Sequence, residues 1–164
     1  MPEANKFIEL LNTHQNIIHK VCSLYMNNIT EREDLFQEIT LQAWNAFKSF
    51  RGEAKFSTWL YRVALNTAIS FYRKEKNKPG FKTVEGLPEY IEEKDEIEEQ
   101  MQAMYKAIGS LSKIDKALVM LYLEDYGYDE IGSMLGITAN NVAVKMNRIK
   151  TKLKDESKKH YQFS

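Results

Sequence analysis

Apolar residues recur three and four positions apart along most of this chain, and this period is typical of α-helices with one buried face. Between residues 7 and 25, the residues on this period are Phe7, Leu10, Leu11, Ile17, Ile18, Val21 and Tyr25. Glycine and proline, which interrupt helices, number only seven and three among 164 residues, and four of these ten lie between residues 79 and 88. The pattern predicts an all-α protein with two small helical domains on either side of this break.

Capping residues indicate where two of the expected helices begin. Thr30 is followed by Glu33 three residues later, which is the spacing of a capping box, and predicts a helix that continues to about residue 47. Ser57 or Thr58 is the expected N-cap of the next helix, which continues to about residue 74. Beyond the break, the pattern predicts helices at about residues 97–110, 114–124, 129–135 and 139–154.

The break between the two domains is acidic. Residues 77–100 carry 3 basic and 8 acidic side chains, whereas residues 1–76 carry 10 and 8, and residues 101–164 carry 10 and 7. We therefore expect a flexible acidic linker over residues 77–95, between an N-terminal domain of residues 1–76 and a C-terminal domain of residues 96–164. The formal net charge of zero argues against a free-standing DNA-binding protein held by bulk charge.

Composition argues against several classes of protein. No apolar run approaches the roughly 20 residues of a membrane helix, and we expect no signal peptide. Cys22 is the single cysteine, so an internal disulfide is impossible and a reducing cytoplasm is the expected location. His14, His19 and His160 have no companions at ligand spacing, so we expect neither a metal site nor a cofactor.

The C-terminal segment has the layout of a helix-turn-helix. A short helix is expected to end at Leu135, Gly136 supplies a turn with positive φ, and Thr138 caps a second helix. On a helical wheel, the second helix has a buried stripe that consists of Val142, Met146, Ile149 and Leu153.

The opposite face of this second helix has side chains suited to DNA. It presents Asn140, Val144, Asn147, Arg148 and Thr151, flanked by Lys145, Lys150, Lys152 and Lys154. Asparagine and arginine can make paired hydrogen bonds to base edges, valine can contact a thymine methyl group, and lysines can contact phosphates. The alternative is an amphipathic helix with an ordinary solvated basic face. The short helix, the glycine turn and the capped second helix together favour DNA binding.

The helix expected near residues 34–48 has an unusual polar side. Asp34, Gln37, Glu38 and Asn45 lie there, together with Leu41 and, at its edge, Trp44. Apolar side chains among carboxylates favour a docking surface for a basic protein partner, although a solvated face is the alternative. Acid–base catalysis is disfavoured because no nucleophile, metal-ligand set or phosphate-binding loop accompanies the carboxylates.

Residues 50–76 combine six aromatic and six basic side chains. The buried stripe expected for this helix is Leu60, Val63, Ala64, Thr67 and Phe71, with Arg62, Asn66, Ile69 and Arg73 on another side. Trp59 and Phe71 are expected in the core. The remaining rings, which alternate with cations, are suited to unpaired bases, because rings stack on bases and cations hold the backbone.

Two segments resemble conserved regions of bacterial sigma factors of the extracytoplasmic-function group. The segment DLFQEITLQAWNAFKSFRGEAKFSTWLYRVALNTAISFYRK is similar to region 2, and IGSLSKIDKALVMLYLEDYGYDEIGSMLGITANNVAVKMNRIKTKLK is similar to region 4. The resemblance implies a region 2 helical bundle and a region 4 helix-turn-helix, and a protein that binds core RNA polymerase and directs transcription initiation. It implies promoter DNA as a second partner, and an anti-sigma factor is a further expectation from the family.

The resemblance also implies roles for individual residues. Docking on core polymerase is implied for Asp34, Leu35, Gln37, Glu38 and Leu41. Recognition and melting of the minus-ten element are implied for Phe50, Arg51, Lys55, Phe56, Trp59, Tyr61, Arg62, Asn66 and Arg73. Recognition of the minus-thirty-five element is implied for Asn140, Asn141, Val144, Lys145, Asn147, Arg148 and Thr151.

This chain departs from the family pattern at a few positions. Asn140-Asn141 and Ala143-Val144 stand where Gly-Thr and Arg or Ser are frequent, so the resemblance does not define the promoter sequence. Gly132 stands where alanine is commoner, which predicts a small loss of helix propensity. The competing hypotheses are a stand-alone helix-turn-helix regulator with a dimerising N-terminal domain and, far less favoured, an enzyme that uses Asp34 and Glu38.

Overall fold

The computed structural model describes residues 2–76 and 106–162, with side chains described up to residue 71 in the first range and up to residue 156 in the second. The chain divides into two compact units, Met1–Glu89 and Tyr90–Ser164. The described residues form helices and no strands, so the predicted all-α fold with two helical domains is confirmed. The expected linker, residues 77–95, lies outside the described residues, and its boundaries stay a prediction.

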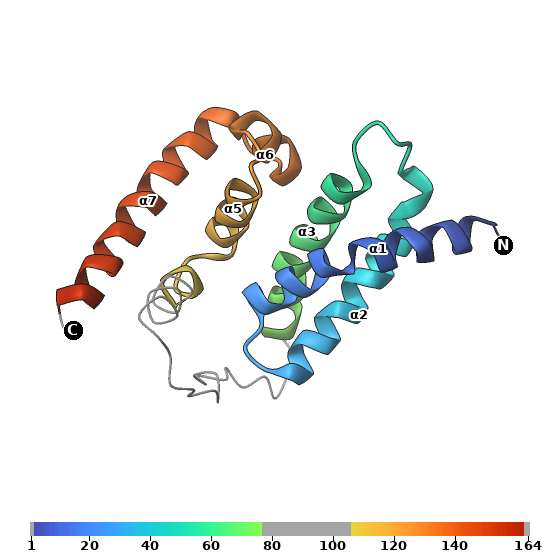
Figure 1. Ribbon diagram of the computed structural model, residues 1–164, viewed down its shortest axis with the longest axis horizontal. Helices are drawn as coiled ribbons and strands as arrows, with labels where there is room; N and C mark the ends of the chain where they lie inside the picture. The colour runs from blue at the N-terminus through green and yellow to red at the C-terminus, as the bar shows by residue number, and fades with distance from the viewer. Residues whose placement is uncertain (1, 77–105, 163–164) are drawn as a thin grey trace. The chain divides into compact units, whose positions relative to one another are not determined.

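The first unit is a bundle of three long helices, α1 (Pro2–Tyr25), α2 (Ile29–Ala46) and α3 (Phe56–Lys76), and a 3-10 turn, η1 (Phe47–Ser49), follows α2 (Figure 1). A short turn reverses the chain after α1, so α2 packs back along it, and α3 packs against both helices. The largest fully buried side chains of the unit are Ile18, Val21, Leu35, Ile39, Leu60 and Leu65. Each such side chain contributes about 1.5–3 kcal/mol when it leaves water, and these helices are held together mainly by this burial.

The predicted start of α2 was wrong. Asn28, not Thr30, is the N-cap: its side-chain oxygen accepts a hydrogen bond of 2.8 Å from the backbone N–H of Glu31. Asn28 can do this because its backbone is extended and the preceding turn is fixed by Arg32, whose Nε donates to the carbonyl of Met26 at 3.0 Å. Both residue types are good caps, so the turn decides between them.

Two expectations for α3 were also wrong. The helix begins at Phe56, so Ser57 and Thr58 lie inside it and neither is its N-cap. Ile69, expected on a different side of the helix from the buried stripe, is buried, as is Tyr61. Of the predicted buried stripe, Leu60 and Ala64 are buried, whereas Val63, Thr67 and Phe71 are only half-buried. Because α3 packs against two helices, its buried arc extends to the side that carries Tyr61, Leu65 and Ile69.

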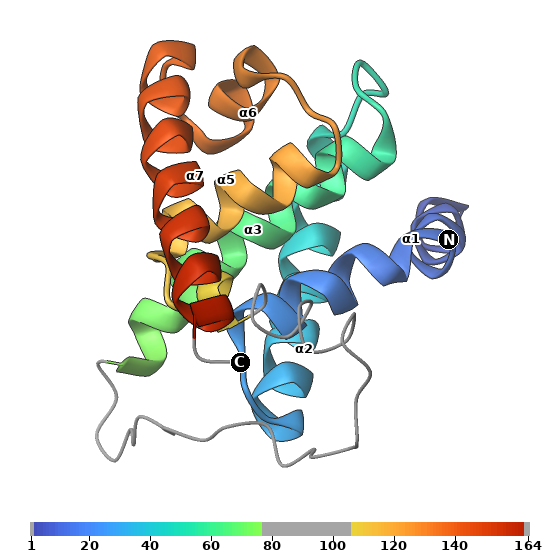
Figure 2. The same ribbon diagram turned by 60° about the vertical axis from the view of Figure 1, so that its left-hand side comes forward.

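The second unit contains α5 (Lys113–Leu123), α6 (Tyr128–Leu135) and α7 (Ala139–Gln162), as Figure 2 shows from a second side. The predicted turn between α6 and α7 is confirmed. Gly136 adopts φ of 76°, a conformation that favours glycine. The side-chain oxygen of Thr138 accepts a hydrogen bond of 3.0 Å from the N–H of Asn141 and so caps α7.

Gly132 has a role that helix propensity does not reveal. Its carbonyl accepts hydrogen bonds from the N–H groups of Gly136 (2.8 Å) and Ile137 (2.9 Å), which close the end of α6. A Cβ atom on Gly132 would lie 2.5 Å from the carbonyl oxygen of Ile137. The turn therefore passes so close to α6 that a residue with a side chain does not fit without movement of the backbone.

Candidate functional site

The solvent-facing side of α2 carries most of the residues expected to dock on a partner. Asp34 and Gln37 are exposed, and Glu38 is half-buried and accepts a hydrogen bond of 3.1 Å from the side-chain amide of Gln42. Leu35 does not belong to this surface, because it is fully buried in the bundle. Its side chain packs against the core of the bundle.

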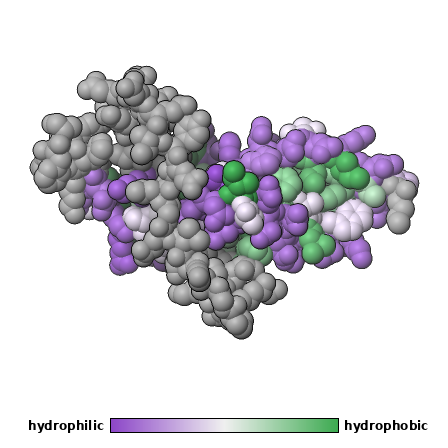
Figure 3. All heavy atoms as spheres, turned by 90° about the horizontal axis from the view of Figure 1, so that it is seen from below, coloured by the Kyte–Doolittle hydropathy of each residue, from purple (hydrophilic) through white to green (hydrophobic). Residues whose placement is uncertain are grey.

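An apolar groove borders this surface. Leu41 and Trp44 on α2 are 51% and 39% exposed, and Ile8 on α1 is 52% exposed, which is unusual for large apolar side chains. The groove has a volume of about 470 Å³ and is lined by Ala4, Phe7, Ile8, Phe36, Gln37, Thr40, Leu41 and Trp44. Figure 3 shows hydrophobic patches among hydrophilic atoms over this part of the molecule.

Sequence reasoning missed the contribution of Ile8 to this groove. An isolated apolar residue beside the expected stripe of α1 carries no signal of its own. Its meaning appears only because α2 returns along α1 and brings Leu41 and Trp44 to the same groove.

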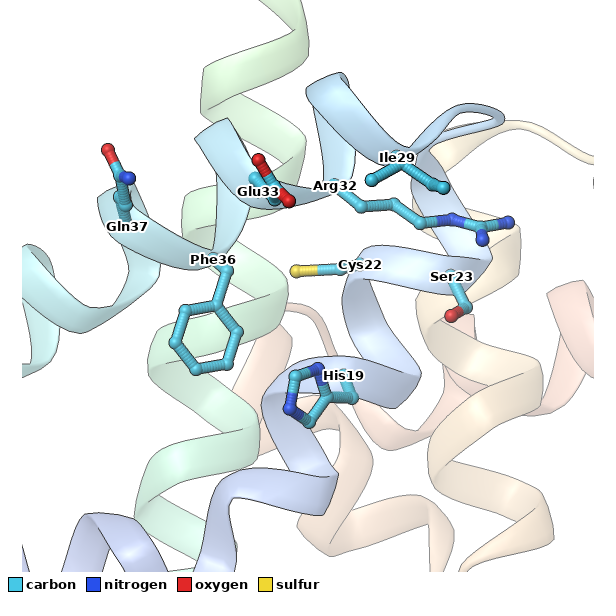
Figure 4. Close-up of a pocket in the computed structure, with 8 residues that line it drawn as sticks. All are labelled: His19, Cys22, Ser23, Ile29, Arg32, Glu33, Phe36 and Gln37. Atoms are coloured by element: carbon cyan, nitrogen blue, oxygen red, sulfur yellow. The ribbon is translucent and has the colours of Figure 1, made fainter.

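A second, more polar pocket of about 300 Å³ lies between the other ends of α1 and α2 (Figure 4). It is lined by His19, Cys22, Ser23, Ile29, Arg32, Glu33, Phe36 and Gln37. The rings of His19 and Phe36 stack with their centroids 4.9 Å apart. Burial raises the pKa of the Cys22 thiol to about 11, although the nearby charge of Arg32 acts in the opposite direction. A protonated, buried thiol is a poor nucleophile, so the pocket is not equipped for covalent chemistry.

The described residues also provide no metal centre. No group of three or more His, Cys, Asp or Glu side chains within residues 2–71 and 106–156 is arranged to hold a metal ion. In the part of the chain that the structure describes, no helix has the length and apolar character needed to cross a membrane.

A cluster of aromatic rings holds the loop between η1 and α3. The ring of Phe47 lies 5.1 Å from that of Phe7, 6.0 Å from Phe50, 6.5 Å from Phe56 and 6.2 Å from Trp59, measured between centroids. Phe50, Phe56 and Trp59 also contact one another at 5.2–5.7 Å. These separations lie in the range of favourable aromatic pairs. The ends of the loop over residues 51–55 are thus fixed by rings from α1, η1 and α3.

The residues expected to bind the minus-ten element differ in exposure. Arg51, Lys55, Arg62 and Asn66 are exposed, and Phe50 and Trp59 are half-buried. Phe56 and Tyr61 are buried, with Tyr61 only 3% exposed, so neither presents a ring to solvent. The side chain of Arg73 lies outside the described residues. Trp59, expected in the core, has a ring that is half-buried at the rim of the cluster.

The face of α7 expected to bind duplex DNA is separate from the core. Val142, Met146 and Ile149 are buried, and Leu153 is half-buried, as the predicted stripe requires. The exposed residues on the other face are Asn140, Asn141, Val144, Asn147, Arg148 and Thr151, and Lys145 is half-buried. The arrangement therefore presents amides, a guanidinium group and a branched apolar side chain on one exposed helix face.

Comparison with known proteins gives a family match within each of the two units. The chain matches the sigma-70 region 2 family over residues 10–78 and the sigma-70 region 4 family over residues 101–153. It is 27% identical to the ECF RNA polymerase sigma factor SigW of Bacillus subtilis over 162 residues, which cover 89% of this chain and 86% of that protein. It is 28% identical to the ECF RNA polymerase sigma-E factor of Escherichia coli over 146 residues, covering 79% and 76% of the two chains.

Two solved structures have a similar fold. The sigma factor RpoE, in complex with the anti-sigma factor NepR from Bartonella quintana, matches with a TM-score of 0.71 and 19% identity over 93% of this chain and 97% of that chain. CnrH, in complex with the cytosolic domain of CnrY, matches with a TM-score of 0.64 and 19% identity over 93% and 87% of the chains.

The two family matches together span most of the chain, with region 2 preceding region 4. The chain belongs to the sigma-70 family, in its extracytoplasmic-function (ECF) group, and is a sigma factor that acts in transcription initiation.

Proposed function

We propose that this sigma factor docks on core RNA polymerase through α2, while two further surfaces recognise the two promoter elements. The observation that carries the proposal is the position of the motif residues on α2. Asp34 and Gln37 are exposed beside the apolar groove that Leu41 and Trp44 line. Carboxylates around exposed apolar side chains match a partner that offers apolar anchors and a basic rim.

The loop over residues 51–55 and the adjoining face of α3 are the proposed surface for the minus-ten element. Arg51, Lys55 and Arg62 are exposed and can hold the backbone of an unwound strand, and Asn66 can pair with a base edge. Phe50 and Trp59 are half-buried, so part of each ring is available to stack on a base, which is worth about 1–3 kcal/mol. Phe56 and Tyr61 act from the core by positioning this surface.

The exposed face of α7 is the proposed surface for the minus-thirty-five element. Arg148 can donate paired hydrogen bonds to a guanine, Asn147 can pair with an adenine, and Val144 can contact a thymine methyl group. Asn140, Asn141, Lys145 and Thr151 complete the surface toward the phosphates. A duplex is the expected form of DNA here because a single exposed helix face fits the major groove.

The protein is proposed to supply recognition rather than catalysis, and to act in the cytoplasm, where RNA polymerase acts. An anti-sigma partner is proposed because RpoE, which has a similar fold, forms a complex with the anti-sigma factor NepR, and CnrH is likewise in complex with a second protein, the cytosolic domain of CnrY. Its binding would compete with core polymerase if it covers the groove at Leu41 and Trp44.

The test is transcription in vitro with reconstituted holoenzyme, combined with a binding measurement to core polymerase. Asp34→Lys should weaken binding to core at least tenfold, because a reversed charge at the rim opposes a basic partner. Asp155→Lys, the same exchange at an exposed position on α7, is the matched control and should leave core affinity unchanged. Unchanged core affinity in Asp34→Lys would contradict the docking assignment, and failure of the wild-type chain to bind core would overturn the proposal.

A further inference from the structure

One lysine of α7 is held by two tyrosines of the preceding helices. The Nζ atom of Lys150 lies 4.7 Å from the centroid of the Tyr122 ring and 3.5 Å from the phenol oxygen of Tyr128. The two rings lie with their centroids 6.4 Å apart and their planes tilted by 37°. Tyr122 belongs to the last turn of α5, and Tyr128 is the first residue of α6. We call these two tyrosines and Lys150 the clamp. The clamp connects α5, α6 and α7.

The contacts favour a charged lysine. A cation within about 6 Å of a ring centroid is attracted by the negative face of the ring. The hydrogen bond to Tyr128 is at the outer limit of distance, so the ring contact is the better defined of the two. Hydrogen bonds with the phenols of Tyr122 and Tyr128 raise the pKa of Lys150 above its ordinary value. Tyr122 is 40% exposed, so the core leaves part of this residue open, and Lys150 lies over its ring.

The position of Lys150 on α7 separates it from the proposed DNA surface. At 100° per residue, Lys150 projects about 160° around the helix from Arg148, whereas Lys152 projects only about 40° from it. Lys150 thus lies at the edge of the buried stripe, next to Met146 and Ile149, which are both buried. Tyr122 and Tyr128 contact Lys150 on this side of α7. The face that carries Asn147 and Arg148 lies on the other side of the helix.

We propose that Lys150 is a positioning residue, which fixes the orientation of the recognition helix against α5 and α6, and is not a phosphate contact. This inference rests on the proposed role of α7 in reading the minus-thirty-five element. Loss of the clamp should let α7 change its angle against α6. Base contacts depend on that angle, whereas phosphate contacts from flexible lysines tolerate small changes.

The two roles of a lysine give opposite signatures in DNA binding. Holoenzyme is bound to promoter fragments with an intact or a scrambled minus-thirty-five element at several salt concentrations. Lys150→Met should lower the preference for the intact element about tenfold, with the salt dependence unchanged. Lys152→Met, the matched control, should weaken binding to both fragments equally and reduce the slope of log K against log salt by about 0.9. The proposal would be overturned if Lys150→Met weakened binding to both fragments equally and reduced the salt slope, as Lys152→Met should. It would also be overturned if Lys150→Met bound DNA as the wild type does.

A second measurement tests the clamp without promoter DNA. In the NMR spectrum of the free full-length chain, the ε-methylene protons of Lys150 should lie upfield of those of Lys152, because they face the Tyr122 ring. Tyr122→Leu should abolish this shift and lower the minus-thirty-five preference as Lys150→Met does, whereas Lys150→Arg should retain the preference. An unshifted Lys150 signal in the wild type would refute the clamp. If the shift is present but wild-type holoenzyme ignores the minus-thirty-five element, the proposed function of α7 fails and the clamp stands as a contact of the fold alone.

Discussion

The two units present their proposed DNA surfaces in different ways. In the first unit, the rings that define the loop over residues 51–55 also form part of the core: Phe56 is buried, and Phe47, Phe50 and Trp59 are half-buried. In the second unit, the exposed face of α7 is separate from the buried stripe of Val142, Met146 and Ile149. Substitutions of these rings in the first unit should therefore alter folding and function together, whereas substitutions on the exposed face of α7 should alter DNA recognition alone.

This difference has a physical basis in the two forms of DNA. A surface that holds an unwound strand needs rings, and rings exposed to water on all sides are costly, so packing them against one another stabilises the surface. A surface that recognises a duplex needs polar groups on a rigid helix, which can be solvated without cost to the fold. The proposed assignment of α7 to the minus-thirty-five element therefore implies that promoter preference there can vary with little effect on stability.

The largest expected loss of stability comes from replacing Phe56, whose ring contacts the rings of His14, Phe47, Phe50 and Trp59. Phe56→Ala should lower the free energy of unfolding of the first unit by about 3–5 kcal/mol, because it removes a buried ring and leaves a cavity. It should also slow promoter opening more than closed-complex formation. Both tryptophans of the chain, Trp44 and Trp59, lie in this unit, so tryptophan fluorescence during urea unfolding measures its stability selectively.

The matched substitution in the second unit is Arg148→Ala. Because Arg148 is exposed, the free energy of unfolding should change by no more than about 0.5 kcal/mol. Affinity for the minus-thirty-five element should fall by about 1–3 kcal/mol, measured with holoenzyme on promoter fragments. A large loss of stability in Arg148→Ala, or a Phe56→Ala variant that is as stable as the wild type, would remove the distinction between the two units.

Which face of α7 is exposed could be predicted from the sequence, because the answer depends on the residues of one helix and the turn before it. Gly136 and Thr138 define the ends of the turn, and the period of Val142, Met146 and Ile149 defines which side is buried. Each of these signals is local, so no knowledge of neighbouring helices was required.

The errors arose where a residue's environment depends on packing between helices. Tyr61 and Ile69 are buried because α3 contacts α1 and α2 on two sides, and a helical wheel of α3 alone does not contain that information. Asn28 and Thr30 are both good N-caps, and the turn before α2, in which Arg32 donates to the carbonyl of Met26, places Asn28 at the cap.

Raising the pH should destabilise the first unit more than the second, and the expected loss of stability is intermediate in size. In the first unit, burial raises the pKa of Cys22 from 9.0 to about 11 and also raises the pKa of Tyr25. In the second unit, burial lowers the pKa of Lys116, whereas hydrogen bonds with Tyr122 raise the pKa of Lys150. The shifts in the second unit therefore oppose one another, and those in the first act together.

The sign for Cys22 follows from proton binding. Below pH 9 the thiol is protonated in both the folded and the unfolded chain, so it has no effect. Between pH 9 and about 11 the unfolded chain has lost the proton and the folded chain keeps it, so stability falls as pH rises, by up to about 2–3 kcal/mol. Tryptophan fluorescence in urea, measured from pH 8 to pH 11, should show this loss. Cys22→Ala, referenced to its own stability at pH 8, should show a shallower decline, and an identical decline in both proteins would refute the assignment.

The smallest expected effect concerns Gly132 in the second unit. Helix propensity alone favours Gly132→Ala by up to about 1 kcal/mol, but the new Cβ would lie 2.5 Å from the Ile137 carbonyl and 3.3 Å from the Ala139 nitrogen. Both contacts are backbone atoms of the turn and cannot rotate away. We therefore expect the clash to exceed the gain in propensity and the substitution to destabilise the second unit by about 1 kcal/mol.

Gly109 provides the matched control for this last experiment, because a Cβ there would meet no atom within 4 Å. Gly109→Ala should be neutral or stabilise the unit by about 0.4–1 kcal/mol through the unfolded state. The measurement is thermal unfolding followed by circular dichroism, with tryptophan fluorescence confirming that the first unit is unchanged. If Gly132→Ala stabilised the protein as Gly109→Ala does, the turn would have to yield at little cost. The turn would then hold α7 less rigidly than the contacts of Gly132 indicate. The contrast between the two units would be weaker, because it assumes that the exposed face of α7 is carried by a rigidly held helix.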